Sequence, residues 1–79
     1  MKLAQATGKR IQELLFEKNM SQYRLAKTTC LNDKTISDLI KGKTTDVNFT
    51  TIYLICIALG ISLNEFVDSA LFNIDNIEI

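Results

Sequence analysis

The sequence predicts a single compact all-α domain built from five short helices. Seventy-nine residues can enclose one hydrophobic core but not two. Apolar residues make up 47% of the chain and recur at the three- and four-residue spacing of amphipathic helices. Residues that favour helix starts or helix ends separate these runs, at Ser21, Asn32, Gly42, Asn48, Gly60 and Ser62. We expect residues 1–71 to form the domain and residues 72–79 an apolar tail.

The first two helices are predicted over residues 9–18 and 22–28, and the first is entered near Thr7. Asn19 is expected to stop the first helix, and Ser21 is expected to cap the second. The residues expected to face the core are Ile11, Leu14, Leu15 and Phe16 in the first helix and Leu25 and Ala26 in the second.

The third helix is predicted over residues 33–41, after a turn at residues 30–32 in which Asn32 is the N-cap. Gly42 is expected to end this helix, because glycine tolerates a left-handed backbone. The side chains expected to point inward are those of Ile36, Leu39 and Ile40. Two short helices joined by a turn of three or four residues form a helix-turn-helix unit.

The fourth helix is predicted to begin after Asn48 and to end at Gly60. Its apolar residues are Phe49, Ile52, Ile55, Cys56 and Leu59 on one side and Tyr53, Leu54 and Ile57 elsewhere. Because apolar residues occur on more than one side, we expect this helix to be the most buried.

The fifth helix is expected to start at a capping box of Ser62 and Glu65, with Ile61 packed against Phe66. Its apolar residues are Leu63, Phe66, Val67 and Leu71. Beyond it the tail alternates apolar and polar residues, which predicts an extended segment with Phe72, Ile74, Ile77 and Ile79 on one face. This apolar face either joins the fifth helix in a dimer contact or packs onto the domain's own core.

Charge is unevenly distributed along a chain whose formal net charge is zero. Residues 1–43 contain all nine Lys and Arg and four acids, a net charge of +5, whereas residues 44–79 contain five acids and no base. Such asymmetry indicates nucleic-acid contact by the basic half. The alternative is a segregated surface charge without a partner.

Several classes of protein are not expected. The chain has no histidine, paired-carboxylate motif or glycine-rich phosphate loop, so we expect no enzyme. Cys30 and Cys56 alone are too few for zinc, and Cys56 lies in an apolar run where a thiol packs as a small hydrophobic group. We expect no metal, cofactor, small-molecule ligand or disulfide. Without a secretory signal or a long apolar run, a cytoplasmic protein with no membrane contact is expected.

Residues 21–43, SQYRLAKTTCLNDKTISDLIKGK, resemble the motif of the lambdoid phage repressor and Cro family, also called the xenobiotic-response-element (XRE) family. The matching residues are Ser21, Gln22, Leu25, Ala26, Leu31, Asn32, Thr35, Ile36, Ser37, Leu39, Gly42 and Lys43. Residues 57–67, IALGISLNEFV, are similar to the end of the same pattern. The resemblance spans about residues 9–68 and implies a five-helix, lambda-repressor-like DNA-binding domain.

The resemblance implies that the third helix is the recognition helix in the DNA major groove. The residues that would face base edges are Asp33, Lys34, Thr35 and Asp38. The residues that would contact phosphates are Gln22, Lys41, Lys43, Thr44 and Thr45, with Tyr23 and Asn32 as further candidates. Each lysine has the alternative role of a solvated surface charge. Lysine donates to guanine and aspartate accepts from cytosine, so we expect G·C pairs in the half-site.

Three departures from the family pattern bear on these expectations. Cys30 replaces a turn glycine, which costs about 1 kcal/mol in a left-handed backbone. Leu15 and Ile40 stand where the family often has an ion pair, and we expect their apolar side chains to touch. Asp33 and Asp38 place negative charge on the surface that would face DNA, so binding is expected to be weak and base-selective.

Together these features predict a sequence-specific regulator of transcription that acts as a repressor. Because one copy covers a single half-site, we expect a homodimer through the fifth helix and the tail. The alternative is a helix-turn-helix fold used to bind another protein, since fold alone does not fix function. Whether the chain serves a phage, a mobile element, an antitoxin system or a chromosome stays open at this point.

Overall fold

The computed structural model describes residues 1–43 and 48–78. Within these ranges the chain forms five α-helices and two single-turn 3₁₀ helices: α1 (Leu3–Glu17), α2 (Gln22–Thr29), α3 (Asp33–Ile40), α4 (Phe49–Leu59), α5 (Leu63–Val67), η1 (Ala70–Phe72) and η2 (Ile74–Asn76). The predicted five-helix all-α fold is confirmed. Thr44, Thr45 and Ile79 lie outside the described residues.

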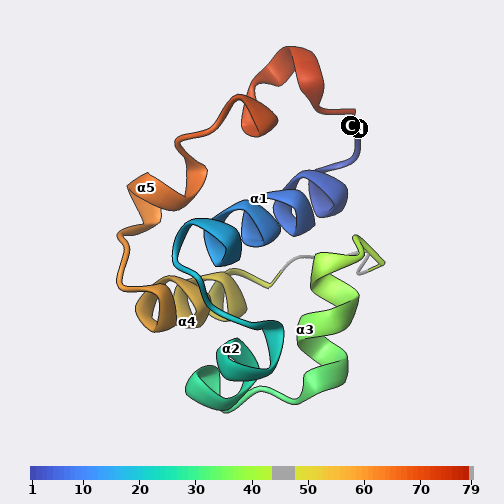
Figure 1. Cartoon of the computed structure of the whole chain (residues 1–79). Coiled ribbons are helices and arrows are strands. Elements are labelled where there is room, and N and C mark those ends of the chain that lie inside the picture. Colours follow the sequence, from blue (N-terminus) through green and yellow to red (C-terminus); the bar gives the residue numbers. More distant parts are fainter. Residues whose placement is uncertain (44–47, 79) are drawn as a thin grey trace.

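The longest helix, α1, runs through the middle of the molecule (Figure 1). It packs against α3 on one side and against η1 on another. The α2 helix packs against both α3 and α4, and α4 also contacts α5. The predicted helix-turn-helix is therefore formed by α2 and α3, and α1 and α4 support it from behind.

The first helix begins at Leu3, so the prediction of a start near Thr7 was wrong. The Gln5 side-chain Oε1 accepts a hydrogen bond from the Lys2 backbone N–H at 3.0 Å and satisfies a donor at the helix start. Farther along, Phe16 is almost fully exposed, contrary to its predicted place in the core. It lies about 100° around the helix from Leu15, which is already at the edge of the buried face.

All four predicted N-caps are confirmed. In each case the side-chain oxygen accepts a hydrogen bond from a backbone N–H in the first turn: Ser21 from Arg24 at 3.0 Å, Asn32 from Thr35 at 2.7 Å, Asn48 from Thr50 at 2.8 Å, and Ser62 from Glu65 at 3.1 Å. These bonds satisfy N–H groups that a helix start leaves unpaired.

The turn between α2 and α3 has the expected left-handed backbone, with φ of 61° at Cys30. A buried threonine braces this turn from inside. The Thr29 hydroxyl donates to the Leu25 carbonyl at 2.9 Å and accepts from the Leu31 backbone N–H at 3.3 Å. These bonds offset the strain of about 1 kcal/mol that a non-glycine residue brings to this conformation.

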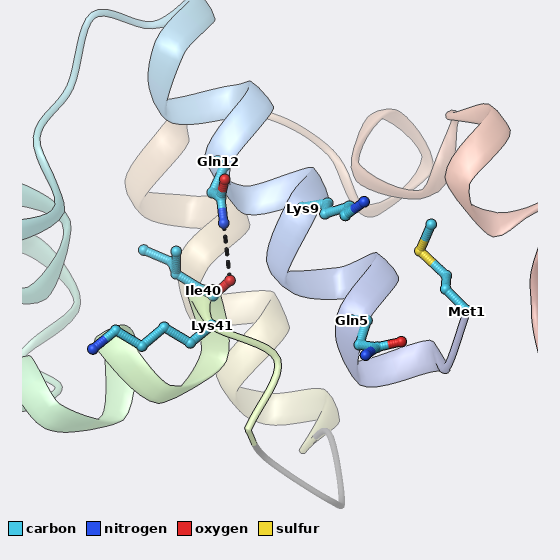
Figure 2. A pocket seen from close by; sticks show the side chains of 6 residues that line it. All are labelled: Met1, Gln5, Lys9, Gln12, Ile40 and Lys41. Carbon is cyan, nitrogen blue, oxygen red and sulfur yellow. Dashed lines mark hydrogen bonds between the residues drawn. The ribbon is translucent and has the colours of Figure 1, made fainter.

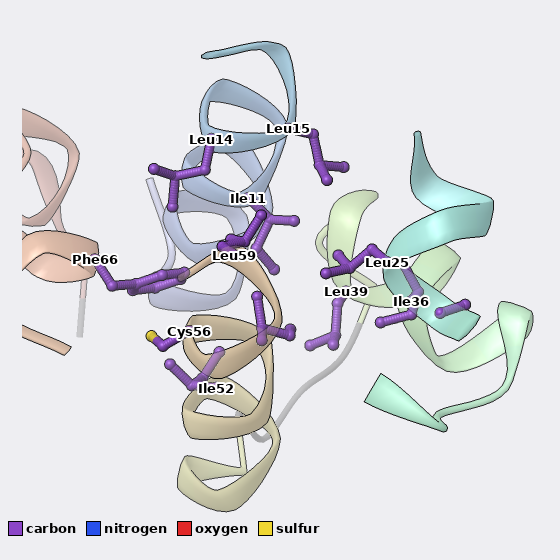
Figure 3. Packing of buried hydrophobic residues seen from close by; sticks show 12 residues of the cluster. Ile11, Leu14, Leu15, Leu25, Ile36, Leu39, Ile52, Cys56, Leu59 and Phe66 are labelled. Carbon is purple, nitrogen blue, oxygen red and sulfur yellow. The ribbon is translucent and has the colours of Figure 1, made fainter. Parts of the chain in front are cut away.

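The core lies where α1, α2, α3 and α4 meet, and Phe66 of α5 closes one end (Figure 3). Its buried members are Ile11, Leu14, Leu15, Leu25, Ala26, Ile36, Leu39, Ile52, Ile55, Cys56, Leu59 and Phe66. The predicted burial of Cys56 is confirmed, and burial raises the pKa of its thiol. Ile40 and Leu15 belong to this packing, but direct contact between their side chains stays a prediction.

The prediction that the fourth helix is the most buried was wrong. Ile52, Ile55, Cys56 and Leu59 face the core, whereas Phe49, Tyr53 and Ile57 are exposed to solvent. The partners of α4 are α2 and α5, which cover only part of its circumference. An apolar composition on all sides therefore did not lead to burial on all sides.

The predictions for the C-terminal end were wrong in two respects. The fifth helix ends at Val67, so Leu71 lies in η1 instead. The tail is not extended, because η1 and η2 fold it back on α1, and the Phe72 ring lies 6.1 Å from the Phe66 ring. Side chains bond to local backbone here, as in the 2.7 Å bond from the Asn76 amide to the Ala70 carbonyl, and such bonds favour turns over strands.

Arg10 ties α1 to the end of α5. Its guanidinium donates to the backbone carbonyls of Phe66 and Glu65, both at 2.7 Å, and to a Glu13 carboxylate oxygen at 3.3 Å. The side chain is mostly buried, so this member of the basic half has a structural role.

The α1 helix closely approaches the last turn of α3 at Gly8. A Cβ on Gly8 would overlap the Leu39 carbonyl oxygen and would lie 2.6 Å from that of Ile40. One turn later the Gln12 amide donates to the Ile40 carbonyl at 3.0 Å. Glycine is therefore needed at this position because of its small size.

We expect Gly8→Ala to lower the free energy of unfolding by about 1–3 kcal/mol, because the methyl group overlaps α3 backbone. Helix propensity alone would raise that free energy by about 1 kcal/mol. Urea unfolding measures the difference. Gly60→Ala is the control, since no atom lies within 4 Å of its Cβ and only the positive φ opposes it. Equal stability of Gly8→Ala and the wild type would contradict the close packing.

Candidate nucleic-acid interface

The outward face of α3 is polar along its whole length. Asp33, Lys34 and Lys41 are exposed, and Ser37 and Asp38 are half-buried. They lie opposite Ile36 and Leu39, which are in the core. Two of the predicted base-reading residues, Lys34 and Asp38, therefore lie one turn apart on the side of α3 that faces away from the core.

Two of these residues are paired with each other. The Lys34 ammonium lies 2.8 Å from a carboxylate oxygen of Asp38, one helical turn away. This hydrogen bond, together with the charge, lowers the pKa of Asp38 and raises the pKa of Lys34. Lys43 and Lys41 lower the pKa of Asp38 further. Three lysines therefore act on the negative charge of Asp38, which was expected to weaken DNA binding.

Thr35 is also engaged within α3. Its hydroxyl donates to the Asn32 side-chain oxygen at 2.8 Å, and its backbone N–H donates to the same oxygen. The cap uses the oxygen of Asn32, so the amide NH₂ is the group of this side chain that can reach a phosphate. Thr35 is half-buried and is better placed to orient Asn32 than to reach far into a groove.

The start of α2 lies beside the start of α3. Tyr23, Asn32 and Asp33 line one shallow hollow, together with Lys27 and Cys30. The Lys27 ammonium lies 5.2 Å from the centre of the Tyr23 ring, a cation–π distance. The structure thus brings two predicted phosphate contacts next to one predicted base contact.

Gln22 is the first residue of α2 and is exposed, as its predicted role requires. Helix N-termini present backbone N–H groups to anions. Here the Ser21 hydroxyl accepts from the Arg24 N–H. Gln22 thus lies at the end of α2 where these N–H groups are.

Lys41 and Lys43 follow α3 directly and are both exposed. Lys41 lines a hollow with Gln5, Lys9 and Gln12 of α1. Figure 2 shows that the Lys41 side chain extends away from Lys9, so the two ammonium groups do not converge. Lys41 is therefore part of the α3 surface and not of a closed anion pocket.

Sequence reasoning missed two residues of this surface. Ser37 lies one turn after Asp33 on the outward side of α3, and Lys27 stacks over Tyr23. Each lies four residues after a predicted site residue on the same helix, Asp33 or Tyr23, and this helical spacing could have identified both. The predicted phosphate contacts Thr44 and Thr45 lie outside the described residues.

Other kinds of site find no support in the described ranges. Residues 1–43 and 48–78 contain no group of three or more His, Cys, Asp or Glu placed to hold a metal ion. No helix of this part of the chain is long and apolar enough to cross a membrane.

Comparison with known proteins bears directly on this surface. The family described as "Cro/C1-type HTH DNA-binding domain" matches residues 10–69, which include α2 to α5 and most of α1. The chain belongs to this Cro/C1-type family. Its members are DNA-binding domains, so the α2–α3 unit is a DNA-binding helix-turn-helix.

A solved structure resembles this Cro/C1-type domain over nearly its full length. The protein is prophage Lp1 protein 11, with a TM-score of 0.81 and 30% sequence identity. The match covers 92% of the present chain and 97% of the other. A comparison with curated proteins finds no match. The similarity therefore extends beyond α5 into the turns that fold back on α1.

We expect the pKa of the Asp38 carboxyl to lie below its ordinary value of 3.8. Side-chain NMR over a range of pH measures this pKa. The ion pair with Lys34 then stabilises the domain at pH values above the ordinary pKa of Asp38. This contribution is lost as the pH falls through the lowered pKa of Asp38, and also as it rises through the raised pKa of Lys34. Lys34→Met should raise the Asp38 midpoint, whereas Lys18→Met should not. An unchanged midpoint in Lys34→Met would disprove the pairing in solution.

Proposed function

We propose that this domain is a sequence-specific repressor of transcription that places α3 in the major groove of duplex DNA. The observation that carries the proposal is the polar outward face of α3, where Lys34 is exposed and Ser37 half-buried, and which the exposed Lys41 continues. The Cro/C1-type family supports DNA as the partner. Repression is part of the proposal, because a protein bound across a promoter would block access by other proteins.

Base reading is assigned to Asp33, Lys34 and Asp38, with Thr35 in an orienting role. A lysine donates to the O6 and N7 acceptors of guanine, and a carboxylate accepts from the amino group of cytosine. The Lys34–Asp38 pair presents a donor and an acceptor side by side, a pattern that suits a G·C-containing half-site. Binding to DNA would require this pair to open or to be read as a unit.

Phosphate contacts are assigned to both sides of α3. Gln22 and the N-terminus of α2 would hold one strand, assisted by Tyr23 and the Asn32 amide. Lys41 and Lys43 would hold the backbone beyond α3, where Thr44 and Thr45 are further candidates. The positive charge needed for this arrangement comes from residues 1–43, which have a net charge of +5.

A two-fold dimer is part of the proposal. One copy would cover a half-site of about five base pairs, and two recognition helices about 34 Å apart would read a palindrome. The expected dimer surface was α5 with the tail. Val67 and Ile74 are exposed there, whereas Phe72 packs inward.

The alternative function is protein binding through the same helix-turn-helix. It would use the α2–α3 surface without phosphate contacts, so affinity for DNA would stay low at low salt. A linear fall of log affinity with log salt concentration, with a slope reflecting several released counterions, distinguishes DNA binding from this alternative.

Duplexes selected from a random pool provide the specific probe, and a scrambled duplex provides the reference. We expect Lys34→Ala to reduce discrimination between them by roughly 1–3 kcal/mol. Lys43→Ala should weaken both complexes equally and reduce the salt slope by about 1. Fluorescence anisotropy over a range of salt concentrations measures both. If neither variant alters binding, α3 does not face DNA.

Asp38→Asn should strengthen binding to the scrambled duplex and steepen the salt slope by about 1, because it frees the Lys34 ammonium and removes a negative charge. Discrimination should fall, since a base-reading acceptor is lost. Asp68→Asn is the control, because it makes the same change in charge directly after α5, a helix that lies away from α3 in the fold (Figure 1). Weaker binding of Asp38→Asn to scrambled DNA would contradict the assigned role.

A further inference from the structure

We propose that a basic hollow between the start of α1 and the turn after α3 binds a phosphate group, and that the carboxylate of Glu78 restricts this binding. The hollow has a volume of about 350 Å³. Three separate segments of the chain line it: Lys2, Leu3, Ala4 and Gln5, then Gly42 and Lys43, then Glu78. Lys43 is one of the proposed phosphate contacts, whereas Lys2 and Gln5 lie outside the helix-turn-helix. We call this surface the Lys2–Lys43 hollow.

The backbone brings both lysines to this hollow. Gly42 has a positive φ of 70°, which turns the chain at the end of α3. A Cβ on Gly42 would lie 3.1 Å from the Gln5 Cα, so this turn packs closely against α1. The Lys43 N–H donates to the Asp38 carbonyl at 3.0 Å, and the Lys2 N–H donates to the Gln5 side chain at 3.0 Å. The two lysine side chains therefore start from fixed points beside one hollow.

Both lysines are available to a ligand. Each is exposed, and neither forms an ion pair within residues 1–43 and 48–78. An ammonium group binds phosphate as a compact charge with three hydrogen-bond donors. Two such groups beside one hollow favour an anion with more than one charged oxygen. A phosphate group meets this requirement and is the ligand that Lys43 is already proposed to contact.

The tail brings a negative charge to the same hollow. Glu78 donates its backbone N–H to the Met1 carbonyl at 2.7 Å and forms a parallel bridge with Lys2. The bond from the Asn76 amide to the Ala70 carbonyl holds the turn that leads there. Figure 1 shows the two ends of the chain side by side. The tail therefore places a carboxylate at a hollow that two lysines line.

Glu78 weakens the site without closing it. Its side chain is 70% exposed, and its carboxylate lies 3.8 Å from the Met1 ammonium rather than against either lysine. A carboxylate and a phosphate repel each other, and salt screens this repulsion because both groups are open to solvent. Loss of the charge at position 78, or release of the tail from α1, therefore raises the affinity for phosphate at low salt.

The phosphate has two possible sources, the DNA backbone and a free phosphate compound. The first source rests on the proposed function: Lys43 holds the backbone beyond α3, and Lys2 extends this contact along the same strand. The second source does not depend on DNA binding. A scrambled duplex and inorganic tripolyphosphate therefore serve as separate probes.

Titration of the full chain with tripolyphosphate at low salt, followed by backbone amide NMR, tests the hollow without DNA. We expect saturable shifts at the residues of the hollow, Lys2, Gln5, Gly42 and Lys43. Lys2→Met should weaken binding and Glu78→Gln should strengthen it, each at least about threefold, the effect of one unit charge at roughly 7 Å in water.

Matched controls separate a local effect from a change in net charge. Asp75→Asn removes a charge from the same tail, but Asp75 does not line the hollow. Lys18→Met removes a positive charge at the other end of α1. Both controls should bind tripolyphosphate as the wild type does.

Fluorescence anisotropy with the scrambled duplex tests DNA as the source. Lys2→Met should reduce the slope of log affinity against log salt concentration by about 1, because one phosphate contact is lost. Glu78→Gln should tighten binding about threefold at low salt, and this gain should vanish at high salt. Absence of any duplex binding contradicts the proposed function. Duplex binding that neither variant alters assigns the hollow to free phosphate compounds.

Two results of the tripolyphosphate titration would overturn the proposal, whatever the duplex does. One is a set of shifts that leaves out the residues of the hollow. The other is an equal effect of Glu78→Gln and Asp75→Asn, or of Lys2→Met and Lys18→Met, since these charges would then act only through the net charge of the molecule.

Discussion

The position of α3 depends on how closely α1 can approach its last turn. At Gly8 the two backbones are so near that no side chain fits between them, and Gln12 bonds to the Ile40 carbonyl one turn away. This contact fixes the end of α3 from which Lys41 and Lys43 continue. With Ile36 and Leu39 held in the core, the polar face of α3 has one orientation relative to the rest of the domain.

The parts of the fold that sequence reasoning found are those that local chemistry determines. Ser21, Asn32, Asn48 and Ser62 cap helices because their side-chain oxygens satisfy nearby N–H groups, whatever the tertiary structure. The parts it missed depend on distant neighbours. Exposure of Phe16 and Phe49 is set by which helices cover α1 and α4, and the folding back of the tail is set by contacts with α1.

The candidate site shows the same division. The polar face of α3 could be predicted from helical periodicity opposite Ile36 and Leu39, and the structure reproduces it. The pairing of Lys34 with Asp38 could be predicted from their four-residue spacing, but the influence of Lys43 on Asp38 required the backbone to turn at Gly42. The net charge of the basic half did not predict the charge around α3. Arg10 counts toward that net charge but bonds to the backbone of α5, and the groups near α3 determine the local electrostatic field.

The cysteine in the turn between α2 and α3 is a natural site for attaching a fluorescent label. Cys30 is exposed in the hollow that Tyr23 and Asp33 also line, whereas Cys56 is buried with a raised pKa. A thiol-reactive dye would therefore couple at the edge of the recognition surface and spare the interior. The natural sequence thus allows single-site labelling, and changes in the emission of that dye would follow occupancy of α3 without any engineered residue.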